Sequence, residues 1–112
     1  MRIAVACDGL GIAPYYTQSR SYMCYTVTFG VVSSAANVPI TEKIDNSVAD
    51  LLKALEVDVL ITGKIDPNHA SELVANGIEV VSDETGLASE AVNTYLAKTF
   101  VPLDDWDDED WD

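Results

Sequence analysis

Residues 57–81, VDVLITGKIDPNHASELVANGIEVV, are the stretch that decides the fold of this chain. The first six residues are almost continuously apolar, as expected for a central strand that is covered on both faces. The Asp-Pro pair at 66–67 predicts a helix start, because aspartate can cap free N–H groups and proline fits the first helical position. The Asn-Gly pair at 76–77 predicts the helix end, and residues 78–81 the next strand. This strand–helix–strand order indicates a parallel pair within an α/β sheet.

The flanking sequence supplies the other elements of one α/β domain. Aromatic and β-branched residues predict strands over 2–6, 22–28 and 31–38, the last two joined by a turn at 29–30. Apolar spacing predicts helices over 45–55 and 85–98. The expected fold is a mixed sheet of about five strands with helices packed on it. In this sheet the first strand and the strand at 59–62 should be parallel neighbours.

Composition and charge restrict the class of protein. The 112 residues include 48% apolar residues, and no apolar run approaches the roughly 18 residues of a membrane span. The N-terminus enters a strand pattern directly, without a signal-peptide pattern. We therefore expect a cytoplasmic protein with one domain over residues 1–100 and no membrane partner. Nucleic acid is not an expected partner, because the formal net charge is −13 and only six Lys and Arg residues could neutralise phosphates.

An acidic tail, residues 101–112, follows the domain. Seven of the 19 acids lie in residues 104–112, which leaves 12 acids against six bases, a formal charge of −6, in residues 1–103. Like-charge runs are usually solvated, but Trp106 and Trp111 place large apolar surfaces within this run. One hypothesis for function is therefore a protein-interaction module, whose tail binds a protein partner or a second copy of the chain.

The candidate ligand site lies in the loops after the first strand and after residues 59–62. In open α/β sheets, ligands bind beyond the carboxyl ends of parallel strands. Lys64 and the N-terminus of the following helix would attract a small anionic ligand, and glycines would let the backbone approach it. The alternative is a tight turn with an exposed lysine, since the phosphate-loop and G-x-G-x-x-G patterns are absent. The residues that we expect to form the cofactor-binding site are Cys7, Asp8, Gly9, Tyr15, Tyr16, Gly63 and Lys64.

A metal site is the second chemical hypothesis for this region. Cys7, Asp8 and His69, which is the only histidine, could converge on a soft metal or a cluster, with Cys7 and His69 as the predicted metal ligands. The alternatives are a thiol that packs as a small hydrophobe and a histidine on the surface. No C-x-x-C or H-x-x-x-H spacing supports ligation. Ser19 and Ser21 have no adjacent base, so nucleophilic catalysis is not expected.

Four segments of the chain resemble the dinitrogenase iron–molybdenum cofactor biosynthesis family. These segments are MRIAVACDG (1–9), YMCYTV (22–27), residues 58–81 and ETGLASEAVNTYLA (84–97). The resemblance implies a three-layer ribonuclease H-like motif. It also implies a non-catalytic domain that binds or carries an iron–molybdenum or iron–sulfur cluster. A nuclease is not expected, because such enzymes need several converging acids for two metals and only Asp8 and Asp66 are candidates.

Two departures from the family's pattern concern the candidate site. The family typically has Gly-Gly-Ile-Gly-Pro after the strand, and here residues 63–67 read GKIDP, so that Lys64 and Asp66 replace glycines. The family commonly has a His-Phe-Gly element in the first loop, where this chain has Tyr-Tyr-Thr at 15–17. A histidine that is a candidate cluster ligand in the family is therefore missing.

Overall fold

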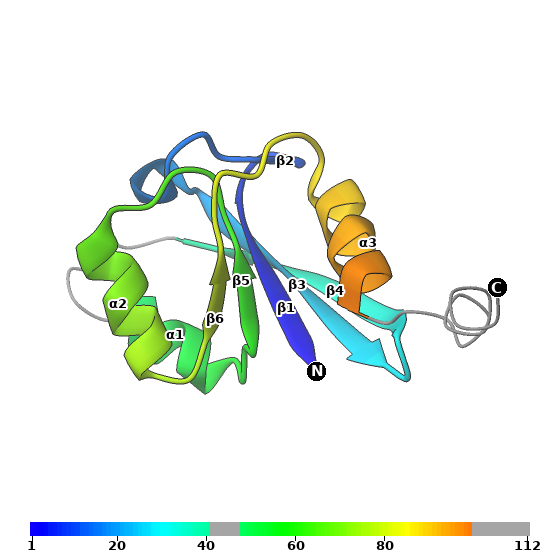
Figure 1. Cartoon of the computed structure of the whole chain (residues 1–112). Coiled ribbons are helices and arrows are strands. Elements are labelled where there is room, and N and C mark those ends of the chain that lie inside the picture. Colours follow the sequence, from blue (N-terminus) through cyan, green and yellow to red (C-terminus); the bar gives the residue numbers. More distant parts are fainter. Residues whose placement is uncertain (41–47, 100–112) are drawn as a thin grey trace, which may run out of the picture.

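A computed structural model describes residues 1–40 and 48–99 of the chain. These residues form six strands, three α-helices and one short 3-10 helix (Figure 1). The strands are β1 (Arg2–Asp8), β2 (Gly11–Ile12), β3 (Ser21–Thr28), β4 (Val31–Pro39), β5 (Val59–Ile61) and β6 (Glu79–Val81). The helices are α1 (Val48–Ala54), α2 (Pro67–Ala75) and α3 (Ala88–Thr99), and the 3-10 helix is η1 (Tyr16–Gln18). The predicted acidic tail and the predicted start of the first helix, residues 45–47, lie outside the described residues.

The sheet is mixed, and its strand order is β4-β3-β1-β5-β6, with β2 paired to β1. β1 and β5 are parallel neighbours, with Ile3 opposite Val59, which confirms the predicted parallel pair. β5 and β6 are also parallel, and β3 and β4 form an antiparallel hairpin beside β1. The prediction of about five strands missed β2, because a two-residue strand is too short to show an alternating pattern.

Helices cover both faces of the sheet. Successive side chains of a strand point to opposite faces. In β1, Ile3, Val5 and Cys7 pack against the apolar face of α3, and the alternate residues Ala4 and Ala6 pack on the other face with side chains of α1 and α2. Figure 1 shows α3 on one side of the sheet and α1 and α2 on the other. The fold thus has three layers, and this is why β1 and β5 are apolar along almost their whole length.

Local signals in the sequence account for most element boundaries. Asp66 accepts a hydrogen bond from the backbone N–H of His69 at 3.3 Å and caps α2, whose first residue is Pro67. At the hairpin turn, Phe29 and Gly30 both have positive φ angles, of 53° and 77°, as a type I′ turn requires.

No helix in the described part of the chain is long and apolar enough to cross a membrane.

The last helix begins three residues later than predicted, at Ala88 rather than at residue 85. The residues before it are bonded to the first loop instead. The carbonyl oxygen of Gly86 accepts from the N–H of Ile12 at 2.8 Å, and the N–H of Ala88 donates to the carbonyl of Leu10 at 3.1 Å. Gly86 has a positive φ of 95°, which a right-handed helix does not allow. The helix therefore starts only after the residues that are hydrogen-bonded to the first loop.

Candidate functional site

The loops after β1 and β5 lie side by side, as predicted for the carboxyl ends of neighbouring parallel strands. The backbone N–H of Tyr16 donates to the carbonyl oxygen of Lys64 at 2.7 Å, and the N–H of Lys64 donates to the carbonyl of Pro14 at 2.9 Å. An isolated β-bridge also pairs Tyr15 with Lys64. Main-chain hydrogen bonds thus hold the two loops together and bring Tyr15, Tyr16 and Lys64 into one region.

The two glycines of the predicted site have different roles in the structure. A Cβ atom on Gly63 would lie less than 3.0 Å from the carbonyl oxygens of Ala13 and Pro14, which is closer than real Cβ atoms approach. Gly63 therefore allows the close approach of the chain's own first loop, whereas the sequence predicts the approach of a ligand. Gly9 has open space around it and a positive φ of 75°, so it serves the turn between β1 and β2.

A pocket of about 310 Å³ lies where these loops meet, and we call it the loop pocket. Within it Tyr16 is buried, whereas Tyr15 is 49% exposed. Lys64 is exposed and makes no ion pair with any described residue. The residues that line the loop pocket are Tyr15, Tyr16, Thr17, Lys64, Ile65 and Asp66. Three of the seven residues of the predicted cofactor-binding site therefore share one pocket.

The acidic residue of the loop pocket, Asp66, is already engaged at the N-terminus of α2. Its carboxylate caps the helix and is hydrogen-bonded to Nδ1 of His69. This side-chain hydrogen bond lowers the pKa of Asp66 below its usual value. The His69 ring lies against Tyr16, with ring centroids 5.5 Å apart. Because Asp66 already gives the positive end of the helix dipole a negative partner, Lys64 is the remaining attraction for an anion here.

The two predicted metal ligands are not brought together. Cys7 is fully buried in the core beside α3, whereas His69 contacts Tyr16, which belongs to the core on the opposite face of the sheet. Burial raises the pKa of the Cys7 thiol and favours its protonated form, which is a poor metal ligand. Within residues 1–40 and 48–99, no three His, Cys, Asp or Glu side chains gather to hold a metal ion. Asp8 is exposed, with one carboxylate oxygen 3.6 Å from Nε of Arg20.

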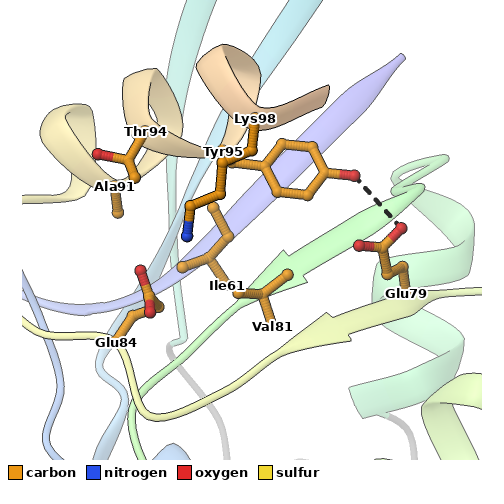
Figure 2. A pocket seen from close by; sticks show the side chains of 8 residues that line it. All are labelled: Ile61, Glu79, Val81, Glu84, Ala91, Thr94, Tyr95 and Lys98. Atoms are coloured by element: carbon orange, nitrogen blue, oxygen red, sulfur yellow. Dashed lines mark hydrogen bonds between the residues drawn. The ribbon is translucent and has the colours of Figure 1, made fainter. Parts of the chain in front are cut away.

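A second pocket, of about 300 Å³, lies between α3 and strands β5 and β6, and we call it the helix pocket (Figure 2). Tyr95 points toward Glu79 in Figure 2, and its hydroxyl donates to the Glu79 carboxylate at 3.3 Å. Apolar side chains contribute to its lining, whereas its charged residues are two glutamates and one lysine. The described residues that line the helix pocket are Ile61, Glu79, Val81, Glu84, Ala91, Thr94, Tyr95 and Lys98. The helix pocket thus has a net negative charge.

The helix pocket was not predicted from the sequence. Ala91, Tyr95 and Lys98 follow one another at helical spacing, so a shared helix face could have been recognised from the sequence. Which strands this face would meet could not be recognised, because that depends on where α3 crosses the sheet.

Thr62 is a buried polar residue that no sequence pattern predicted as part of a site. Its side chain is fully buried, and its hydroxyl has no hydrogen-bond partner among the described residues. Its backbone N–H donates to the carbonyl of Val81 at 2.9 Å, and its carbonyl accepts from the N–H of Glu84 at 3.1 Å. Val81 and Glu84 line the helix pocket, and Lys64, two residues after Thr62, lines the loop pocket. The main chain of Thr62 is therefore hydrogen-bonded to residues of the helix pocket and lies two residues before a residue of the loop pocket. In this sense Thr62 joins the two pockets.

Comparison with protein families gives one match that covers most of the chain. The family described as dinitrogenase iron-molybdenum cofactor matches residues 1–98. These residues include both pockets and end just before the C-terminus of α3. None of the curated proteins compared with the chain matches it.

Several solved structures share the arrangement of helices and strands. The crystal structure of PH0822 is 16% identical, with a TM-score of 0.82 over 88% of this chain and 90% of that one. The protein MJ0327 from Methanocaldococcus jannaschii is 14% identical, with a TM-score of 0.72 over 88% and 89%. The apo form of the orange protein from Desulfovibrio gigas is 25% identical, with a TM-score of 0.68 over 87% and 88%. These similarities establish a common fold.

Proposed function

Because this chain belongs to the dinitrogenase iron–molybdenum cofactor family, we propose that it is a non-catalytic binding or carrier domain for an anionic metal cluster. The proposed site is the loop pocket. One observation carries the proposal: Lys64 has no ion-pair partner among the described residues and lies beside Tyr15 and Tyr16. This position, beyond the carboxyl ends of β1 and β5, is where open α/β sheets bind ligands.

The chain's side chains do not fit a cluster that is held by protein ligands. Protein-held iron–sulfur clusters use thiolates. The only cysteines are Cys7, which is buried, and Cys24, which is half-buried, and burial raises the pKa of both thiols. His69 is hydrogen-bonded to Asp66, and residues 15–17 lack the family's loop histidine. We therefore propose a cargo that keeps its own ligands and is held by charge and aromatic contact.

The two pockets differ in the charge of their lining residues, and therefore in their suitability as binding sites for such a cargo. Among the described residues that line the loop pocket, the only acid is Asp66, and its carboxylate is hydrogen-bonded to His69 and to the N-terminus of α2. In the helix pocket two glutamates face one lysine. Like charges at short range repel, so an anionic cluster should bind in the loop pocket and avoid the helix pocket.

Two finer expectations belong to the same proposal. The three-layer arrangement of helices and sheet supports the ribonuclease H-like motif that the family resemblance implies. We also keep the expectation of a cytoplasmic protein. The alternative function, an interaction module that acts through the acidic tail, depends on residues outside the described ranges, and no observation favours it.

Two anaerobic experiments test this function and separate cargo binding from cluster ligation. In the first, the protein is titrated with a preformed, thiolate-capped iron–sulfur cluster anion, and the bound cluster is measured by its absorbance after gel filtration. In the second, the protein is incubated with ferrous iron and sulfide, in parallel with a Cys7→Ser variant. We expect binding in the first experiment and no cysteine-dependent cluster in the second. Failure to bind the preformed anion would contradict the function, and a cluster that Cys7→Ser abolishes would contradict the proposed mode of binding.

A further inference from the structure

The two edges of the sheet differ in length and in charge. β6, at one edge, has three residues and begins with the charged Glu79. β4, at the other edge, has nine residues, none of them charged. Among the described residues, only β3 pairs with β4. The outward main-chain N–H and C=O groups of β4 therefore have no strand partner in that part of the chain, and such an edge is a template for another strand.

The usual protections of an edge strand are almost absent from β4. Natural proteins protect edges with charged side chains, proline or bulges. β4 has a proline only at its last residue, Pro39, and a register shift only opposite Thr26 and Val27. The five residues from Ser33 to Asn37 are all exposed. The middle of the strand is thus accessible to a partner.

Charge is absent from the entire hairpin and not only from its edge. Residues 21–40 contain no Asp, Glu, Lys or Arg, although 22% of the chain is charged and its formal net charge is −13. The negative charge that would keep two copies apart is therefore carried by other parts of the chain. The function proposed above gives no reason for an uncharged run of this length.

We propose that β4 pairs with β4 of a second copy of this chain, antiparallel about a two-fold axis, so that two sheets join into one. A two-fold axis requires a self-complementary surface. The centre of β4 is Ser34-Ala35-Ala36, and both ends are apolar, Val31-Val32 and Val38-Pro39. Antiparallel order sets the start of one strand against the end of the other, so apolar ends meet. Small uncharged residues at the centre let the two backbones reach strand spacing without like charges face to face.

The expected salt dependence has a definite sign. Each copy has a formal charge of −13, so long-range repulsion opposes association. The paired strands themselves have no charged side chains whose ion pairs salt could weaken. Added salt screens this repulsion. Dimerisation through β4 should therefore strengthen as the salt concentration rises.

The primary test is the mass of the full-length chain by sedimentation equilibrium, from micromolar to millimolar concentration, at low and high salt. We expect a reversible monomer–dimer equilibrium that high salt favours. Ala35→Lys introduces like charges near the two-fold axis and should weaken dimerisation by about fivefold or more. Ser71→Lys is the matched control, because it makes the same change of charge at an exposed position of α2. This control should not weaken dimerisation, since it only lowers the net negative charge.

Amide hydrogen exchange supplies a second readout in the unmodified protein. Protection of β4 should rise with protein concentration, whereas protection of β6 should not. If Ala35→Lys alters the fold, as judged by circular dichroism, Asn37→Lys replaces it at another exposed position of β4. A chain that stays monomeric under all conditions would overturn the proposal. The proposal would also be overturned by a dimer whose formation is unaffected by the β4 variants and in which the amides of β4 exchange as fast as in the monomer. The interface would then lie elsewhere, for example in the tail.

Discussion

The loop pocket and the helix pocket have similar volumes but are built in different ways. Main-chain hydrogen bonds between two loops, which follow neighbouring parallel strands, form the loop pocket. The helix pocket is a space between side chains of α3 and the β6 edge of the sheet. The loop pocket contains a lysine, Lys64, that has no ion-pair partner among the described residues, whereas two glutamates line the helix pocket. Sheet topology thus decides where a pocket can form, and the charges left without partners decide what kind of ligand it can hold.

The largest effect on stability is expected from a substitution that disrupts the loop pocket alone. Gly63→Ala would place a methyl group against the carbonyl oxygens of Ala13 and Pro14. The Pro14 carbonyl accepts from the N–H of Lys64, so it cannot move away without loss of a hydrogen bond between the loops. We expect the free energy of unfolding, measured with urea, to fall by about 3 kcal/mol. Gly11→Ala is the matched control, because its Cβ would lie 3.3 Å from the carbonyl oxygen of Gly86. It should lose at most about 1 kcal/mol, and equal losses would mean that the clash at Gly63 is not the cause.

A smaller effect is expected at Thr62, which joins the two pockets. Thr62→Val keeps the shape of the side chain and removes a buried hydroxyl that has no partner among the described residues. The free energy of unfolding should stay unchanged or rise by up to about 1 kcal/mol. Thr62→Ser, which keeps the hydroxyl and removes a methyl group, should lose about 1 kcal/mol instead. If the valine variant were the less stable of the two, the hydroxyl must have a partner such as a buried water.

The smallest effect concerns the acid of the loop pocket and its dependence on pH. The hydrogen bond from His69 lowers the pKa of Asp66 in the folded state. Asp66 therefore contributes stability above its usual pKa of about 4, and this contribution is lost as the pH falls through the lowered value. Asp66→Asn keeps a helix cap but should lack this acid-dependent part. Urea midpoints of both proteins across the acidic range test this, and a difference that does not change with pH would contradict it.

Most of the fold could be predicted because its signals are local. The cap at Asp66, the glycine after α2 and the positive φ angles of the hairpin turn depend on residues a few positions apart. β2 and the delayed start of α3 could not be predicted in the same way. β2 consists of only two residues, which pair with the end of β1. The start of α3 depends on hydrogen bonds between residues 10–12 and residues 86–88, which are far apart in the sequence.

The candidate site was predictable in position but not in detail. Parallel neighbouring strands bring Tyr15, Tyr16 and Lys64 together, as expected from the topology. The separation of Cys7 from His69 follows from the alternation of side chains in β1, since Cys7 lies on the same face as Ile3 and Val5. The role of Gly63 depends on the carbonyl oxygens of a loop about fifty residues earlier, and no local pattern in the sequence reports such a contact.

Binding of the iron–sulfur cluster anion to Lys64→Gln and Lys98→Gln variants tests most directly whether the loop pocket is the site. Each substitution removes one exposed ammonium group from one of the two pockets, so the net charge of the chain changes equally. We predict that Lys64→Gln weakens binding about tenfold, as expected for the loss of one charged contact, and that Lys98→Gln changes it by less than about twofold. Equal losses would mean that overall charge alone governs binding, and a larger loss with Lys98→Gln would place the cargo in the helix pocket. Either result would contradict the loop pocket as the binding site.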